Sequence, residues 1–360
     1  MKIETNNDTY ISNKLITWYQ TNRRELPWRE TTNPYIIWIS EIILQQTRVA
    51  QGLDYFNRFV ARFPNVQALA EASEDEVLKY WQGLGYYSRA RNLHTAAKTI
   101  MQQFGGKFPT DYSDVRSLKG IGDYTAAAIV SFAWNKPYAV VDGNVYRVLS
   151  RLFAIETPID TTQGKKVFAE LASSLLSHQQ AGLHNQAIME LGALQCVPQN
   201  PDCTVCPLAD VCMAYLQQNV SDYPKKQGKI KTRNRYFHYL YIIYKKQTTW
   251  IQKRQDDDIW KGLYQFPLIE TEQPCEWEAL SQMEEWKKVF QGCGKITVQT
   301  MSPVRKHVLS HQTLYATFYQ IEVENTGDLS SNYQQQIARE ELDSYAVPIL
   351  IHKYLISLDL

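Results

Sequence analysis

The stretch "LKGIGDYTAAAIVSFA", Leu118–Ala133, joins two helix-like segments through a turn that contains Gly120 and Gly122. The two glycines permit positive φ and leave no Cβ in the way, so backbone N–H groups can approach an anion closely. The turn lies just before a helix N-terminus, where unpaired N–H donors and the helix dipole favour a phosphate. The pattern therefore predicts a helix-hairpin-helix whose turn binds the backbone of a nucleic acid. An ordinary glycine-rich loop between packed helices is the alternative.

The chain has 360 residues, which is enough for two domains that each bury a core. Its hydrophobic content of 44% and charged content of 21% are typical of a globular protein, and its net charge is only +1. Contacts with a nucleic acid must therefore come from local patches. The N-terminus lacks the pattern of a signal peptide and no apolar run reaches membrane-spanning length, so we expect a cytoplasmic protein.

Helical patterns extend from about Ser12 to Tyr215. Asn33 and Pro34 predict the cap and first turn of a helix that continues through "YIIWISEIILQQTRVAQGL", residues 35–53. Further helices are predicted over Glu74–Trp81, Ser88–Phe104, Ser113–Leu118, Tyr124–Trp134, Val145–Phe153, Gly164–Leu176 and His184–Leu194.

The composition changes after Tyr215. Residues 223–255 contain ten lysines and arginines and no acidic residue. We predict a helical region over 1–222, a basic linker over 223–235 and a mixed α/β domain over 236–360. Strands are predicted over 236–246 and 248–254, as a hairpin, and over Gln312–Glu324. The basic stretch Lys225–Arg254 either neutralises phosphates or is a solvated tether.

Four of the six cysteines lie in "CVPQNPDCTVCPLADVC" with the spacing C-x6-C-x2-C-x5-C: Cys196, Cys203, Cys206 and Cys212. Four thiolates this close in sequence can surround a [4Fe-4S] cluster or a zinc ion. Zinc ribbons usually present two C-x2-C pairs and this run has one, so the spacing favours the cluster. Because the loop has little apolar content, we expect the metal centre to be structural.

The hairpin, an aspartate about twenty residues later in "VVDGNV", and the cysteine spacing together resemble the helix-hairpin-helix DNA glycosylases that carry an iron–sulfur cluster. Within this superfamily the chain resembles the adenine DNA glycosylase, or MutY, family. The segments that carry the resemblance are "LPWR" (Leu26–Arg29), "SEIILQQTRV" (Ser40–Val49), "GLGYYSRARNL" (Gly83–Leu93), "GIGDYTA" and "MELGALQC" (Met189–Cys196).

The resemblance covers about Leu26 to Cys212 and continues more weakly into the C-terminal domain. It implies a mainly α glycosylase region with a [4Fe-4S] loop, followed by an α/β Nudix-like domain. It also implies an enzyme, acting as a monomer on duplex DNA, that removes adenine mispaired with 8-oxoguanine or guanine.

Two carboxyl groups are predicted to carry the chemistry. Glu41 lies on a helix that is apolar nearly all round, so we expect a raised pKa and a protonated carboxyl that can donate to a leaving base. The resemblance implies that it protonates N7 of adenine; a solvated glutamate is the alternative. Asp142 is expected to cap a helix, which favours its ionised form, and to stabilise an oxocarbenium-like transition state. Asn144 matches a family position near the same centre, where it orients water or the carboxylate.

Tyr124 distinguishes two kinds of glycosylase. In relatives that also nick the DNA strand, a lysine at this position attacks the sugar as a Schiff-base nucleophile. Tyrosine cannot form an imine, and Lys119 belongs to the hairpin. The sequence therefore predicts a monofunctional glycosylase that leaves an abasic site. Packing of Tyr124 against the hairpin is compatible with this prediction.

A base inside a duplex must be flipped out to reach such a site. The resemblance implies that Arg29 and Glu190 contact the flipped adenine. It implies that a second set of residues enters the DNA helix near the oxidised guanine: Gln46, Thr47, Leu84 and Tyr86.

The C-terminal domain resembles that of the same family through "WKGLYQFPLIE", Trp260–Glu270. In "HVLSH", the residues His307, Ser310 and His311 match positions that recognise 8-oxoguanine, whereas Leu309 stands where phenylalanine is common. Because leucine has no aromatic ring, we expect a weaker stacking contribution from this position, whereas the hydrogen-bonding residues are retained. A packing domain without substrate contact is the alternative.

Three other functions are alternatives to adenine excision. A bifunctional pyrimidine glycosylase and lyase is disfavoured by Tyr124. A non-catalytic DNA-binding module would keep the hairpin and the metal centre without using Glu41. A Nudix phosphohydrolase needs a glycine-led helix with a run of arginine and glutamates, which the sequence lacks.

Overall fold

The computed structural model describes residues 5–228, 232–255, 257–329 and 335–358. The chain forms two compact units. Unit 1 comprises Met1–Glu71 and Asn92–Gly228, and unit 2 comprises Ala72–Arg91 and Lys229–Leu360. The predicted division at residues 222 and 235 stays a prediction, and its linker includes residues 229–231, which lie outside the described residues.

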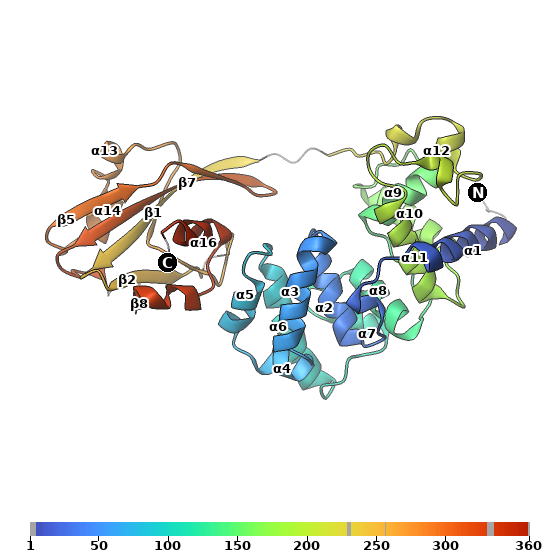
Figure 1. Cartoon of the computed structure of the whole chain (residues 1–360), viewed down its shortest axis with the longest axis horizontal. Helices are drawn as coiled ribbons and strands as arrows, with labels where there is room; N and C mark the ends of the chain where they lie inside the picture. The colour runs from blue at the N-terminus through green and yellow to red at the C-terminus, as the bar shows by residue number, and fades with distance from the viewer. Residues whose placement is uncertain (1–4, 229–231, 256, 330–334, 359–360) are drawn as a thin grey trace. The chain divides into compact units, whose positions relative to one another are not determined.

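Unit 1 is helical (Figure 1). Its α-helices are α1 (Thr5–Asn22), α2 (Pro34–Leu44), α3 (Val49–Arg62), α4 (Val66–Glu71), α7 (Tyr112–Ser117), α8 (Asp123–Trp134), α9 (Gly143–Leu152), α10 (Thr162–Leu175), α11 (Ala181–Leu194) and α12 (Met213–Leu216), and α6 (Ser88–Gln103) begins in unit 2 and ends in unit 1. Three short 3-10 turns accompany them: η1 (Pro27–Arg29), η2 (Cys203–Val205) and η3 (Val220–Asp222).

The core of unit 1 is formed by apolar faces of α1, α8, α9, α10 and α11. Small residues allow α8 and α11 to approach closely: Ala126, Ala127 and Ala128 are buried, and a Cβ on Gly182 would lie 2.5 Å from the Ser131 carbonyl oxygen. α11 packs against both α8 and α9, which brings these three helices together in one part of unit 1.

The prediction of one continuous helix over residues 35–53 is wrong. The Asn33 cap is confirmed, since its side chain accepts a 3.0 Å hydrogen bond from the Tyr35 N–H, but α2 ends at Leu44 and α3 begins at Val49. The apolar pattern stops at the polar run Gln45–Arg48, and Gln46 has a φ of 56°. The resulting turn lets α3 fold back against α2.

The helix-hairpin-helix is formed by α7, a turn and α8. Gly120 has the expected positive φ of 82°, and a Cβ there would lie 2.6 Å from Cβ of Asn92. Gly122 does not need positive φ, because its φ is −93°. A Cβ on Gly122 would meet no atom within 4 Å, so this part of the backbone borders open space just before α8.

The remaining predicted helices of unit 1 are confirmed with end shifts of a few residues, and α1 begins before Ser12. None of the described helices combines the length and the apolar character needed to cross a membrane.

Unit 2 is built on a mixed sheet. Its strands are β1 (Arg233–Tyr244), β2 (Thr248–Lys253), β3 (Tyr264–Gln265), β4 (Leu268–Thr271), β5 (Ile296–Met301), β6 (Arg305–Val308), β7 (Gln312–Val323) and β8 (Gln335–Ala338). The main order is β3-β2-β1-β7-β5, with β4 paired to β1, β6 to β7 and β8 to β2. The three predicted strands and the β1–β2 hairpin are confirmed, but the longest pairing, β1 parallel to β7, joins segments far apart in sequence.

Helices cover both faces of this sheet, which confirms the α/β class (Figure 1). On one face, Tyr354 of α16 (Ile349–Ile356) packs with Tyr241 and Phe318. On the other, α13 (Trp277–Leu280) and α14 (Glu284–Val289) cover apolar residues such as Leu240 and Ile321. The 3-10 turn η4 (Arg339–Ser344) leads toward α16.

The segment 72–91, which contains α5 (Glu74–Trp81), belongs to unit 2 through polar contacts. Asp75 accepts from Lys253 and, at 3.1 Å, from the Tyr264 hydroxyl. Gln82 accepts a 3.3 Å hydrogen bond from the Val347 N–H. These contacts attach the "GLGYY" loop to the C-terminal sheet.

Candidate active site

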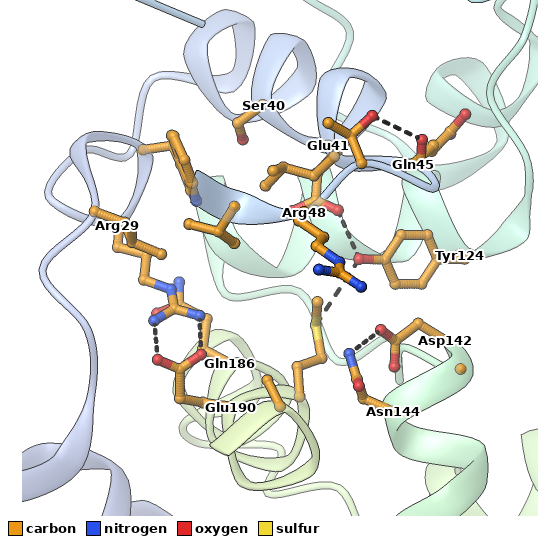
Figure 2. A pocket seen from close by; sticks show the side chains of 18 of the residues that line it. Arg29, Ser40, Glu41, Gln45, Arg48, Tyr124, Asp142, Asn144, Gln186 and Glu190 are labelled. Carbon is orange, nitrogen blue, oxygen red and sulfur yellow. Dashed lines mark hydrogen bonds and ion pairs between the residues drawn. The ribbon is translucent and has the colours of Figure 1, made fainter. Parts of the chain in front are cut away.

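A cavity of about 840 Å³ opens in unit 1 between α2, the turn Gln45–Arg48, α8, the start of α9 and α11 (Figure 2). Its lining includes Glu41, Tyr124, Asp142, Asn144 and Glu190. These residues are up to 149 positions apart in the sequence, yet they face the same cavity, which is large enough for a purine.

Glu41 lies on α2 with 7% of its surface exposed. Burial raises its pKa to about 7, and the nearby Asp142 acts in the same direction, whereas the Tyr124 hydrogen bond and Arg29 oppose the shift. The expected burial and raised pKa are confirmed. Near neutral pH a large fraction of the Glu41 carboxyl groups carries a proton.

Tyr124, on α8, contacts Glu41 directly. Its hydroxyl donates a 2.6 Å hydrogen bond to Oε2 of Glu41 and lies 3.9 Å from Sδ of Met189. Burial and the neighbouring carboxylates hold the pKa of Tyr124 well above its usual value, so the phenol keeps its proton. Tyr124 is therefore more than a packing residue of the hairpin.

Asp142 caps α9, as expected. Its Oδ1 accepts from the Val145 N–H at 2.8 Å and its Oδ2 accepts from the Asn144 amide at 2.9 Å. Burial nevertheless raises the pKa of Asp142 above the usual aspartate value, against the effect of these hydrogen bonds. The cap favours the ionised form, as expected, but burial has the larger effect on the pKa of Asp142.

Asn144 is held in turn by Arg147. The Arg147 guanidinium donates to Oδ1 of Asn144 at 2.8 Å and to the Gly192 carbonyl at 2.6 Å, and its Nε donates to the Cys196 carbonyl at 2.7 Å. A Cβ on Gly192 would lie 2.6 Å from Cβ of Asn144, so α11 can approach the start of α9 only with glycine at this position.

Glu190, on α11, has no exposed surface. Burial alone would raise its pKa, but hydrogen bonds from Arg24 and Arg29 outweigh it and lower the pKa to about 2. Sequence reasoning identified Arg29 and missed Arg24. Arg24 could have been found from the sequence because it lies in the same short segment as Arg29, "RRELPWR".

The residues predicted to enter DNA divide between the units. Gln46 and Thr47 lie in the turn after α2 and line the cavity. Leu84 and Tyr86 belong to unit 2, where Leu84 is buried and Tyr86 is 49% exposed with a φ of 49°. A positive φ in a non-glycine residue is a strained conformation that is enriched at functional sites. Both Gln46 and Tyr86 adopt it.

Unit 2 brings two of the predicted recognition residues together. Ser310 lies in the turn between β6 and β7, and its Oγ is 2.7 Å from the Tyr86 hydroxyl. His311 lies in the same turn and His307 on β6. Burial, together with Lys353, lowers the pKa of His307, whose ring centre is 6.0 Å from that of Trp260. Leu309 packs against the apolar core of the sheet.

The four cysteines of the loop, Cys196, Cys203, Cys206 and Cys212, line one small cavity in unit 1 together with Arg151. Arg151 donates to Sγ of Cys196 at 3.3 Å, and its charge suits a site of several thiolates. Burial and the neighbouring thiols raise the pKa of Cys206 to about 11, so a bound metal would be needed to hold this sulfur ionised. The residues present thus fit an iron–sulfur cluster.

Comparisons with known proteins agree with this geometry. Residues 39–174 match the HhH-GPD superfamily of base excision DNA repair proteins, residues 196–212 match the iron-sulfur binding domain of endonuclease III, and residues 238–357 match the NUDIX domain. The structure of a thermostable thymine-DNA glycosylase aligns with a TM-score of 0.55 at 28% identity, covering 59% of this chain and 100% of that chain. An endonuclease III–DNA complex aligns at 20% identity with a TM-score of 0.51 over 60% of this chain and 98% of that chain, and shows the same fold.

The fold and the site therefore define a base-excision DNA glycosylase of the helix-hairpin-helix class with an iron–sulfur loop. The chain is 39% identical over 271 residues to the adenine DNA glycosylase of Buchnera aphidicola subsp. Schizaphis graminum, covering 74% of this chain and 78% of that protein. It is 40% identical over 215 residues to the adenine DNA glycosylase of Homo sapiens, covering 57% and 39%. The chain belongs to the adenine DNA glycosylase family, is an N-glycosidic hydrolase, and has a [4Fe-4S] cluster as its cofactor.

Proposed function

We propose that this enzyme is a monofunctional glycosylase that flips adenine out of duplex DNA, where it is paired with 8-oxoguanine or guanine, and excises it to leave an abasic site. The observation that carries the proposal is the meeting of Glu41 and Asp142 in one cavity, with Tyr124 hydrogen-bonded to Glu41. The names of the relatives support adenine as the excised base.

Glu41 acts as the general acid. With a pKa of about 7 it is protonated in a useful fraction of molecules and still acidic enough to give the proton up. The Tyr124 hydroxyl occupies Oε2, which leaves Oε1 to carry the proton. Transfer of that proton to N7 allows adenine to depart as a neutral base, because the unprotonated base would leave as a poor anionic leaving group.

Asp142 stabilises the positive charge that develops on the sugar. The Val145 N–H and the Asn144 amide each engage one carboxylate oxygen, and both hydrogen bonds favour the anion. An anion fixed in this way needs little reorganisation when the C–N bond breaks. It either stabilises the oxocarbenium ion electrostatically or forms a transient bond to the sugar, as in glycoside hydrolysis.

Glu190 orients the adenine-binding arginine. Five N–H donors from Arg24 and Arg29 already engage its two oxygens, and a carboxylate offers about four lone-pair sites. We therefore assign the direct contact with adenine to Arg29 and a positioning role to Glu190.

Among the described residues that line the cavity there is no lysine, which supports hydrolysis without Schiff-base strand cleavage.

The four loop cysteines, Cys196, Cys203, Cys206 and Cys212, would hold the cluster, which orders a segment with little apolar packing of its own. Gln46 and Thr47 would fill the gap left by the flipped base, with Leu84 and Tyr86 beside the oxidised guanine. His307, Ser310 and His311 would read 8-oxoguanine, and Gly120 and Gly122 would bind the DNA backbone.

The test is incubation with a duplex that contains adenine opposite 8-oxoguanine, followed by alkali. Strand cleavage only after alkali supports the proposal, whereas cleavage without alkali, or a protein–DNA adduct trapped by borohydride, indicates a lyase. Glu41→Gln should lower the single-turnover rate about 10²- to 10⁴-fold. Glu170→Gln, an exposed residue of α10 paired with Lys166, is the control that keeps the wild-type rate.

A further inference from the structure

Four arginines line the active-site cavity, and three of them are engaged by the protein. Arg24 and Arg29 bind Glu190, and Arg147 binds Asn144 and three carbonyl groups. The fourth, Arg48, is exposed, and within the described part of the chain no group pairs with its guanidinium. Figure 2 shows this side chain extending into the cavity toward the space beside Glu41 and Tyr124.

The turn that presents Arg48 is held in a defined shape. Its backbone is tied to α2 by a 3.2 Å hydrogen bond from the Thr47 N–H to the Leu44 carbonyl, and to α3 by a 2.8 Å hydrogen bond from the Gly52 N–H to the Arg48 carbonyl. The Gln45 amide contacts Oγ1 of Thr125 on α8 at 3.3 Å. The positive φ of Gln46 is the strained link that this arrangement maintains.

Arg48 does not act as a partner of Glu41. The charged groups that shift the pKa of Glu41 are Asp142 and Arg29, and Arg48 is not among them. A cation bound to Glu41 would also favour the carboxylate and weaken it as an acid. The guanidinium is therefore available to a ligand that enters the cavity.

A flipped nucleotide brings a phosphodiester on each side of its sugar to the cavity mouth. The anionic Asp142 would repel these groups, and a guanidinium is the side chain best suited to bind phosphate oxygens in pairs. We propose that Arg48 binds a DNA phosphate next to the extruded nucleotide and so holds the sugar over Asp142. This inference rests on the proposed function and adds a substrate-positioning residue to it.

The test measures how salt affects the binding of a duplex that cannot be cleaved. The probe is a duplex with 2′-fluoro-2′-deoxyadenosine opposite 8-oxoguanine, because the fluorine disfavours the oxocarbenium ion. For Arg48→Gln we expect a plot of log Kd against log salt that is shallower by about 0.9, since one phosphate contact is lost. The affinity difference from wild type should then shrink roughly 3.5-fold between 0.05 and 0.2 M salt. With a cleavable duplex KM should rise because a phosphate contact is lost, and kcat should fall with it because the sugar is held less firmly over Asp142.

Two further variants complete the design. Arg48→Lys keeps the charge and should retain most of the wild-type slope. Arg58→Gln removes an exposed arginine of α3 that does not line the cavity, and it should match the wild type. Three results would each overturn the inference. The first is an unchanged salt slope in Arg48→Gln, and the second is a loss of activity confined to kcat. The third is an Arg48→Lys variant that behaves like Arg48→Gln. Because the binding probe is not cleaved, failure of wild-type cleavage would count against the proposed function alone.

Discussion

The Tyr124 hydroxyl donates a 2.6 Å hydrogen bond to Oε2 of Glu41, although the two residues are 83 positions apart in the chain. Burial has the largest effect on the pKa of Glu41 and raises it to about 7, and the Tyr124 hydrogen bond is the largest of the effects that oppose this rise. The position expected to hold a lysine nucleophile in a lyase instead holds a tyrosine that lowers the pKa of Glu41.

Replacing Tyr124 by phenylalanine should therefore change the pH dependence of excision. A general acid is active when protonated, so the single-turnover rate falls as the pH rises through the pKa of Glu41. Loss of the hydrogen bond should raise that pKa and move the basic limb of the pH–rate profile to higher pH. Tyr35→Phe, which removes a hydroxyl that binds the Phe63 carbonyl, should leave the limb in place. A limb that stays or moves down in Tyr124→Phe would contradict the role given to this bond.

Replacing Glu190 by glutamine should destabilise unit 1. Two arginines would lose a buried carboxylate, and breaking a buried pair in this way typically costs about 3–5 kcal/mol of the free energy of unfolding. Since the folded pKa of about 2 lies below the usual value, the stabilising contribution is complete above about pH 4.3 and is lost as the pH falls toward 2. Urea unfolding monitored by circular dichroism over this range would measure both effects. Glu170→Gln should change neither the stability nor its acid dependence, and an equally stable Glu190→Gln would argue against a structural pair.

The two hairpin glycines should respond differently to alanine. Gly120→Ala forces a Cβ into a backbone with φ of 82° and against Asn92, so it should destabilise the protein by at least about 1 kcal/mol. Gly122→Ala fits the folded backbone and should leave the melting temperature unchanged, while its Cβ blocks the approach of a DNA phosphate and weakens binding. Thermal melting and duplex binding of both variants test this contrast. Full DNA affinity in Gly122→Ala would exclude the hairpin turn as a close backbone contact.

The metal centre should depend on the loop cysteines and not on the others. Cys212→Ser removes one of the four sulfurs around the loop cavity and should lower the iron and sulfide content of the purified protein. Cys275→Ser, in unit 2, should keep the wild-type iron content. Limited proteolysis should cut the loop 196–212 faster in the first variant, because the cluster orders it. Equal iron content in the two variants would refute Cys212 as a ligand.

Features that depend on a few neighbouring residues could be predicted from the sequence. The Asn33 and Asp142 caps, the hairpin turn at Gly120 and the spacing of Cys196 to Cys212 each involve residues no more than 16 positions apart in the chain. The apolar character of α2 was likewise enough to predict that Glu41 is poorly solvated, because its own helix neighbours surround it. The break at Gln46 was missed because a polar run of four residues is compatible with a helix until α3 packs back on α2.

The sequence alone thus determined the helix-hairpin-helix, the iron–sulfur loop and the α/β character of the C-terminal domain, and it singled out Glu41 and Asp142 as the candidate carboxyl groups of the site. Only the tertiary structure decided that Tyr124 binds Glu41 and that Arg24 joins Arg29 in binding Glu190. It also decided that β1 pairs in parallel with β7. Finally, it showed that burial raises the pKa of Asp142 although this residue caps a helix. The physical reason is the distance along the chain between the residues that interact. Caps, turns and metal-ligand spacing are set along the chain, whereas desolvation, ion pairing and strand order depend on which distant segments fold against one another.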